Sequence, residues 1–105
     1  VAALRDRAVE VRITGGCWSA CTLYLALPQT CVTRTARLGF HGPSSRYPGI
    51  PLPKTAFDTI SRRMAAHYPE PLRGWYLAKG RFRTRGFTEF TGAELIRMGV
   101  PRCAG

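Results

Sequence analysis

The chain has 105 residues, of which 45% are hydrophobic. This is enough for a real core and leaves no room for a second domain, so we take 1–105 as a single domain and exclude wholesale disorder. Sixteen lysines and arginines against six acidic residues give a net charge of +10, which favours anionic partners. No apolar stretch approaches the roughly 18 residues that a membrane-spanning helix needs. The first residue is not methionine and no signal peptide is visible, so we expect a mature or trimmed form of a longer precursor.

The cysteines bear on both stability and compartment. An even number of them in a short chain favours two disulfides and an oxidising compartment, with three pairings open. Free core thiols are the alternative. A zinc site is disfavoured because no Cys-x-x-Cys pair occurs and the spacings match no zinc finger or ribbon, so we expect neither a metal nor a cofactor. The four residues are Cys17, Cys21, Cys31 and Cys103.

Periodicity and helix breakers predict the elements of the first part of the chain. Residues 1–8 are typical of the end of a helix, and residues 9–13 alternate apolar and polar side chains as a strand does. A glycine pair then breaks the pattern, and a compact apolar segment begins at Ser19. Because serine is a favoured helix N-cap and Pro28 stops a helix, we predict a helix from Ser19 to about Leu27.

Two short strands and a loop follow this helix. The first strand opens at Cys31, a turn covers residues 34–36, and a second strand over 37–41 ends on His41. Residues 42–53 contain four of the eight prolines. Proline fixes φ and removes a backbone donor, so this segment is predicted to be a surface loop.

Helices dominate the remainder of the chain. Residues 54–68 place apolar side chains three or four apart, as an amphipathic helix does. Residues 72–82 predict a second, short helix weakened by two glycines, and residues 91–99 predict a third that opens with a capping box and closes at a glycine. Residues 100–103 resemble a short terminal strand. Because they contain a proline, we expect this strand near a sheet edge.

The order of these elements predicts the fold class. Strand, helix, strand, strand, loop, helices and strand make an α/β domain, with a mostly parallel sheet and right-handed crossover helices. A parallel sheet needs more strands than these, and the chain opens as if inside a β-α-β unit. We therefore expect a minimal or N-terminally truncated version of such a fold.

One serine and one histidine are the candidate catalytic pair. At the start of a helix, the dipole and free backbone N–H groups stabilise negative charge, and the N–H of Ala20 would point where an oxyanion forms. In an open α/β sheet, helix N-termini and the carboxyl ends of strands lie on one rim, so Ser19 and His41 are predicted to meet there. The alternative is that Ser19 is an ordinary N-cap and His41 an ordinary rim residue.

Two segments resemble a known superfamily. GGCWSACTLYLAL and CVTRTARLGFHGP are similar to the nucleophile-to-histidine region of the Clp protease proteolytic subunit and its Clp/crotonase relatives. The Cys-Trp-Ser-Ala-Cys-Thr and Leu-Gly-Phe-His motifs are closest to uncharacterised bacterial periplasmic Clp-like proteins. FTEFTGAELIRMGVPRC resembles a later segment of the same family. The resemblance covers about residues 9–43 and 86–103, and it implies a Clp/crotonase-like fold.

The resemblance also implies roles for individual residues. Ser19 would be the nucleophile, the Ala20 N–H one oxyanion donor, and His41 the general base. A lysine base, as in signal-peptide peptidases of the superfamily, would be Lys79, but its neighbours indicate an exposed basic loop.

Two departures from the family pattern concern the rest of the catalytic machinery. Phe87 stands where the family has its acid, so Glu89 is the nearest carboxylate and Asp58 the other candidate for orienting the histidine. The family's second oxyanion donor lies further upstream of the nucleophile than the 18 residues present before Ser19.

The resemblance also implies a disulfide pairing. Cys17 and Cys21 could bridge across the turn that holds Ser19, which leaves Cys31 with Cys103. The family places the segments that hold these last two side by side. The alternative pair Cys17–Cys31 would have to span the helix.

These features lead to two predicted functions. The first is a periplasmic or secreted bacterial serine hydrolase, foremost a peptidase, that acts on peptide or protein substrates. The second is a catalytically inactive Clp-like domain that binds a partner or an anionic envelope surface through its arginines. Nucleic-acid binding rests on charge alone and is disfavoured, and the sequence is compatible with oligomerisation.

Overall fold

Two bent strand segments organise the first part of the fold. In the computed structural model, which describes residues 9–47 and 49–104, β1 (Val11–Ile13) bends into β2 (Gly16–Trp18), and β3 (Thr30–Val32) turns into β4 (Arg37–Phe40). β1 pairs with β3 and β2 pairs with β4, both in parallel. The 3₁₀ helix η1 (Ser19–Ala26) connects β2 to β3. The predicted strand, helix and strand pair of this region are therefore confirmed, whereas β2 was missed because its glycines indicated a break.

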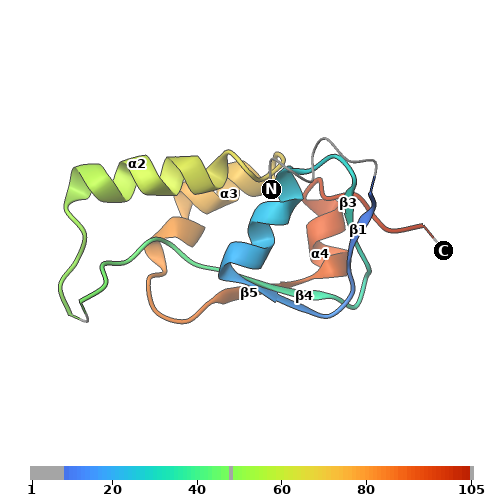
Figure 1. Cartoon of the computed structure of the whole chain (residues 1–105), viewed down its shortest axis with the longest axis horizontal. Helices are drawn as coiled ribbons and strands as arrows, with labels where there is room; N and C mark the ends of the chain where they lie inside the picture. The colour runs from blue at the N-terminus through green and yellow to red at the C-terminus, as the bar shows by residue number, and fades with distance from the viewer. Residues whose placement is uncertain (1–8, 48, 105) are drawn as a thin grey trace.

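The second half adds helices and one more strand. It comprises α2 (Lys54–Ala65), α3 (Leu72–Ala78), η2 (Gly80–Phe82), β5 (Thr88–Thr91) and α4 (Gly92–Arg97). Figure 1 shows α2 and α3 along one side of the molecule, with β4 and β5 along the opposite side and η1 and α4 between them. The chain is thus a mixed α/β structure. The helix end predicted for residues 1–8 lies outside the described residues.

The sheets differ from the predicted single, mostly parallel sheet. The described strands form a two-stranded sheet, β1–β3, and a three-stranded sheet, β2–β4–β5. β5 pairs with β4 in antiparallel orientation. The sequence did not predict β5. The predicted strand at 100–103 is reduced to one parallel bridge between Val32 and Arg102, because Pro101 has no N–H to continue the ladder.

Large apolar side chains fill the space between the sheets and the helices. Leu38 and Phe40 on β4 are buried, as are Leu72 and Tyr76 on α3 and Leu95 on α4. The Phe40 ring makes edge-on contacts with Tyr68, Trp75 and Phe90, with centroids 5.3, 5.9 and 6.0 Å away. Such pairs add roughly 0.5–1.5 kcal/mol each beyond burial. The end of β4, which leads directly into His41, is therefore held rigidly.

The predicted capping box of the last helix is present. Thr91 Oγ1 accepts a hydrogen bond from the Glu94 N–H at 3.2 Å, and Glu94 Oε1 accepts one from the Thr91 N–H at 2.9 Å. The second bond lowers the pKa of Glu94, because the backbone donor stabilises the carboxylate. Gly99 has φ 96, and a Cβ there would lie 2.3 Å from the Glu70 carbonyl oxygen, so only glycine fits where this helix ends.

Both disulfides implied by the resemblance are present. Cys17 is bonded to Cys21 and Cys31 to Cys103, with Cα–Cα distances of 5.3 and 4.8 Å. Two such bonds in a short chain are typical of proteins of oxidising compartments. Among the described residues, no helix is long and apolar enough to cross a membrane.

Candidate active site

Ser19 is the first residue of η1 and not its N-cap. Trp18 occupies the cap position with extended backbone, and no side chain caps the helix. Ser19 has φ 54, the one positive value at a non-glycine position in the described part of the chain. A left-handed backbone is costly for a residue with a Cβ, and such residues cluster at functional sites. The predicted capping role is therefore wrong, and the hydroxyl has another partner.

That partner is His41. Ser19 Oγ lies 2.8 Å from His41 Nε2. The parallel register pairs Trp18 with Gly39, so Ser19 and His41 each lie just beyond the carboxyl end of neighbouring strands. The two side chains thus meet at the rim where the strand order predicted them.

The second ring nitrogen sets the protonation of His41. Nδ1 lies 2.7 Å from the carbonyl oxygen of Gly42. A carbonyl oxygen can only accept, so in the neutral ring Nδ1 carries the proton and Nε2 presents its lone pair. The Ser19 hydroxyl then donates to Nε2. This is the tautomer that a general base requires.

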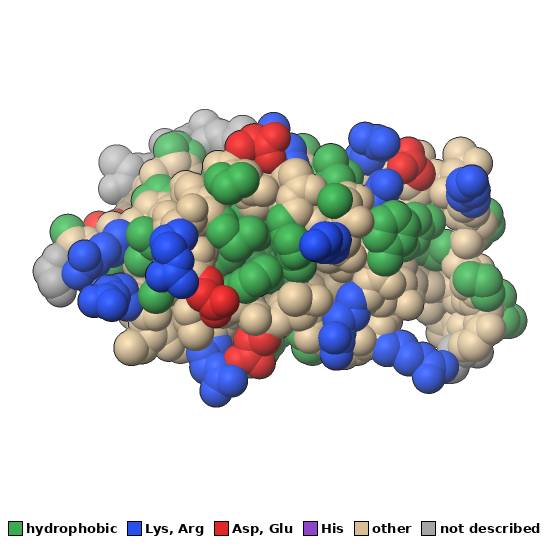
Figure 2. Space-filling view, turned by 180° about the vertical axis from the view of Figure 1, so that it is seen from behind, with side chains coloured by type: hydrophobic (Ala, Val, Ile, Leu, Met, Phe, Trp, Pro, Cys, Tyr) green, Lys and Arg blue, Asp and Glu red, His purple; other side chains and the backbone are tan. Residues whose placement is uncertain are grey.

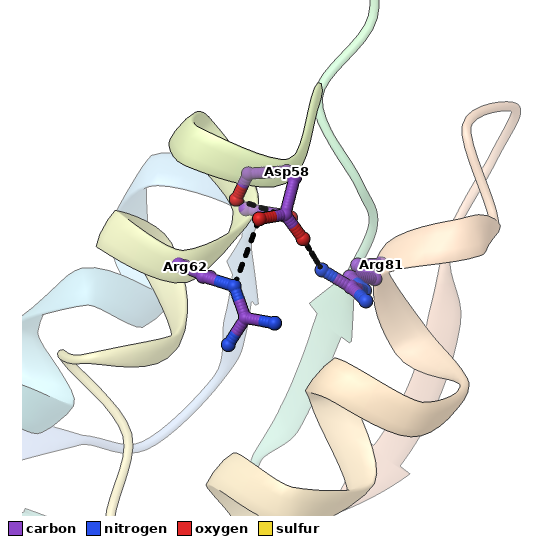
Figure 3. A network of polar contacts seen from close by, with 4 residues as sticks. Asp58, Arg62 and Arg81 are labelled. Carbon is purple, nitrogen blue, oxygen red and sulfur yellow. Dashed lines mark hydrogen bonds and ion pairs between the residues drawn. The ribbon is translucent and has the colours of Figure 1, made fainter. Parts of the chain in front are cut away.

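Neither proposed carboxylate orients His41. Glu89 binds Arg37 through Oε1 on the exposed face of β4 and β5. Asp58 binds Arg62 and Arg81, each at 2.9 Å, between α2 and η2, as Figure 3 shows. Both carboxylates therefore bind arginines and not His41. The Gly42 carbonyl contacts Nδ1, the ring nitrogen that an acid contacts in a catalytic triad.

Phe87 stands opposite the histidine instead of an acid. The antiparallel register pairs Gly39 with Glu89 and Phe40 with Thr88, so its continuation places Phe87 against His41. The two rings lie 5.2 Å apart. The position where the resemblance expects a carboxylate is therefore beside His41, but an aromatic side chain fills it.

Trp18 completes an aromatic wall on one side of the pair. Its ring lies 5.6 Å from the Phe87 ring and directly over Gly39, where a Cβ would come within 2.2 Å of Trp18 Cε3. Trp18 and Phe87 are 43% and 39% exposed. The wall packs against the fold with one side and leaves its other side to solvent beside Ser19 and His41.

Buried hydroxyl groups hold the backbone of the serine. Thr22 Oγ1 donates to the Ser19 carbonyl at 2.6 Å, and the Tyr68 hydroxyl lies 2.8 Å from the same Oγ1. Since the single hydroxyl proton of Thr22 is already donated, Tyr68 must be the donor to Thr22. Burial raises the pKa of Tyr68 to about 12, which keeps this proton in place. Sequence reasoning missed this chain of contacts, because its members are 46 residues apart.

A second tyrosine holds the backbone of the histidine. The Tyr76 hydroxyl donates to the His41 carbonyl at 3.1 Å. Burial raises the pKa of Tyr76 above the usual range, so it too remains a donor. Tyr68 and Tyr76 pack edge to face, with centroids 5.2 Å apart. The two halves of the pair are thus supported from one layer of the core.

The start of η1 offers free backbone N–H groups close to Ser19. Ala20 lies in the first turn of η1, where backbone N–H groups have no helical acceptor. The Cys17–Cys21 bridge spans this turn, with Ser19 and Ala20 inside it. Lys79 is exposed at the end of α3 and takes no part in the Ser19–His41 contact.

Neither a metal-ligand cluster in the described residues nor a known relative points to a different chemistry for this site. Within residues 9–47 and 49–104, no three His, Cys, Asp or Glu side chains gather closely enough to hold a metal ion. Comparisons of the chain with protein-family models, curated proteins and solved structures found no match. The chemistry assigned to the site therefore rests on its own geometry.

Proposed function

We propose that this chain is a serine hydrolase of the Clp/crotonase type, foremost a peptidase, that works in the periplasm or after secretion. The observation that carries the proposal is the 2.8 Å contact between Ser19 Oγ and a His41 whose Nδ1 is tied to a carbonyl oxygen. The positive φ of Ser19 supports it, because a strained serine on a strand-to-helix turn is typical of nucleophiles.

The pair would act by acyl transfer. Ser19 Oγ attacks the substrate carbonyl while His41 Nε2 takes the hydroxyl proton, and the same nitrogen then donates it to the leaving group. In the second half of the reaction, His41 Nε2 takes a proton from water as the water attacks the acyl-serine. It then returns the proton to Ser19 Oγ as the acid product leaves. The Ala20 N–H and the start of η1 stabilise the oxyanion.

The proposed enzyme is expected to be slow compared with a complete triad. The Gly42 carbonyl fixes the tautomer but carries no charge, so it stabilises the developing imidazolium less than a carboxylate does. Detection should therefore use an irreversible probe and not turnover alone.

A fluorophosphonate probe tests the proposal. We expect labelling of the folded protein, no labelling of Ser19→Ala, and at least a tenfold slower reaction for His41→Ala. His67→Ala is the matched control, since His67 Nδ1 binds the Arg63 carbonyl at the end of α2. Absence of labelling in a sample whose circular dichroism shows a folded protein would overturn the proposal, as would equal labelling of wild type and Ser19→Ala.

A second candidate function is binding of an anionic envelope surface. Arg34, Arg97 and Arg102 line one shallow hollow beside α4. Figure 2 shows lysine and arginine side chains spread along the face that it displays, with hydrophobic side chains exposed between them. Binding to phosphatidylglycerol vesicles that falls steeply with salt and is unchanged by Ser19→Ala would support this function. Equal binding to neutral vesicles would exclude it.

A further inference from the structure

A cavity of about 530 Å³ lies between the proline-rich loop, the start of α2 and residues 84–85. Its volume is in the range of small-molecule and side-chain binding sites, which is roughly 300–1,000 Å³. Six of the residues that line it are Pro43, Ser44, Ile50, Leu52, Phe57 and Arg85.

Two segments of the cavity lining lead along the chain to the Ser19–His41 pair. Pro43 follows His41 by two residues, which places its Cα within about 7 Å of the histidine's. Arg85 precedes Phe87 by two residues, and the Phe87 ring contacts His41. The two segments are joined where the Gly42 N–H donates to the Arg83 carbonyl at 2.8 Å.

The junction between cavity and site is tightly packed. A Cβ on Gly42 would lie 1.6 Å from the Arg81 carbonyl oxygen, so the two segments touch through their backbones. Asp58 holds Arg81 from the side of α2 at 2.9 Å (Figure 3). The backbone of Gly42, next to His41, is therefore held against η2 on the side from which the cavity lining begins.

The lining has a definite chemical preference. Prolines, Ile50, Leu52 and the Phe57 ring supply an apolar surface, and serine and threonine hydroxyls supply neutral polar groups. Arg85 is the one charged side chain among the described residues that line the cavity. A ligand that fills the apolar part and carries a carboxylate matches this lining, whereas a ligand with an ammonium group opposes it.

We propose that this cavity is the substrate-binding site of the Ser19–His41 pair, and that it selects peptides with a large apolar residue next to a carboxylate. The apolar side chain occupies the space between Leu52 and Phe57, and the carboxylate pairs with the Arg85 guanidinium. The carboxylate comes either from an acidic side chain or from the C-terminus of the peptide. This inference rests on the proposed hydrolase function for its biological meaning, but the binding step can be measured without catalysis.

Calorimetric titration of the Ser19→Ala protein with four acetylated peptides tests the proposal. All four share the sequence Ala-Ala-Leu-Leu: one is the free acid, one the C-terminal amide, and two are amides extended by Asp or by Lys. We expect the free acid, the Asp peptide or both to bind at least tenfold more tightly than the plain amide, and the Lys peptide to bind most weakly. The stronger of the first two identifies the source of the carboxylate. Equal affinity for all four, or no binding by any, would overturn the proposal.

Variants of the lining separate the charge from the apolar surface. Arg85→Gln should remove the preference for carboxylates, and Ile50→Ser should weaken all four peptides. Both residues are exposed, so folding should persist. Arg97→Gln is the matched control, because Arg97 is an exposed arginine in the hollow beside α4. If Arg97→Gln and Arg85→Gln lower affinity equally, the preference belongs to the net charge and the proposed site is wrong.

The two proposals can fail separately. Selective peptide binding without fluorophosphonate labelling would overturn the hydrolase and keep the cavity as a peptide-binding site. Labelling of Ser19 without peptide selectivity would keep the hydrolase and overturn the cavity.

Discussion

The two disulfides differ in both sequence separation and position. Cys17–Cys21 joins residues 4 apart and encloses Ser19 in the turn between β2 and η1. Cys31–Cys103 joins residues 72 apart and ties the last described segment to β3, next to the bridge between Val32 and Arg102. The first bond therefore acts on the conformation of the site, and the second acts on the connectivity of the whole chain.

This difference separates stability from site geometry. In the chain-entropy account, a disulfide stabilises the fold by restricting the unfolded chain, and the effect grows with the length of the closed loop. The account gives about 2 kcal/mol for the short loop and about 4 kcal/mol for the long one. The bond with the smaller effect on folding is thus the one that holds the strained serine.

Removal of the long-range bond should give the largest loss of stability. For Cys31→Ala/Cys103→Ala we expect the free energy of unfolding to fall by about 4 kcal/mol, measured by urea denaturation at 25 °C. The fraction that stays folded should react with a fluorophosphonate at close to the wild-type rate, because β2, η1 and β4 are unchanged. A loss of labelling in the folded fraction would show that this bond also shapes the site.

Removal of the short bond should cost less stability but slow the labelling of Ser19 more. For Cys17→Ala/Cys21→Ala we expect a loss of about 2 kcal/mol, and at least a tenfold slower labelling of the folded protein. The reason is that Ser19 can then relax from φ 54 to an unstrained backbone, which moves Oγ away from His41 Nε2. Unchanged labelling would mean that packing alone fixes the turn.

The hydroxyl contacts behind Ser19 should have a smaller effect. Thr22→Val removes the donor to the Ser19 carbonyl and the acceptor for Tyr68, which should cost about 1–3 kcal/mol and slow the labelling. Thr30→Val is the matched control: Thr30 is also buried and donates to the Tyr24 carbonyl, far along η1 from the serine. It should lower stability similarly and leave labelling unchanged. Equal effects on labelling would remove the special role of Thr22.

Local patterns predicted part of this site and long-range contacts decided the rest. The Ser19 and His41 pair followed from strand order, and the capping box followed from residues three apart. The Gly42 carbonyl could not be predicted as the partner of Nδ1. Every residue has a backbone carbonyl, so the sequence does not indicate which of them will contact the histidine. β5 was missed because its pairing with β4 depends on a chain reversal through more than forty residues, which no local pattern indicates. The cavity likewise depends on where the proline-rich loop lies relative to the start of α2 and residues 84–85.

A third region, the contact of η2 with α2, lies away from both disulfides. Its contribution to stability should depend on pH. Hydrogen bonds from Arg62 and then Arg81 lower the pKa of Asp58 from its usual value. A lowered pKa in the folded state stabilises the fold above the unfolded-state pKa, and this contribution is lost as the pH falls through the lowered value. Wild-type stability should therefore fall below about pH 4.

Asp58→Asn isolates this contribution. The variant should be less stable than wild type at pH 7, and the difference should be smaller at pH 2.5, as measured by urea denaturation at both values. Glu94, whose pKa is also lowered, keeps its own acid dependence in both proteins and cancels from the comparison. Because the Arg81 carbonyl packs on Gly42, which orients His41, the variant should also slow labelling at pH 7 more than a surface substitution does. If the difference in stability between the two proteins is the same at both pH values, the ion pairs do not account for the role of Asp58.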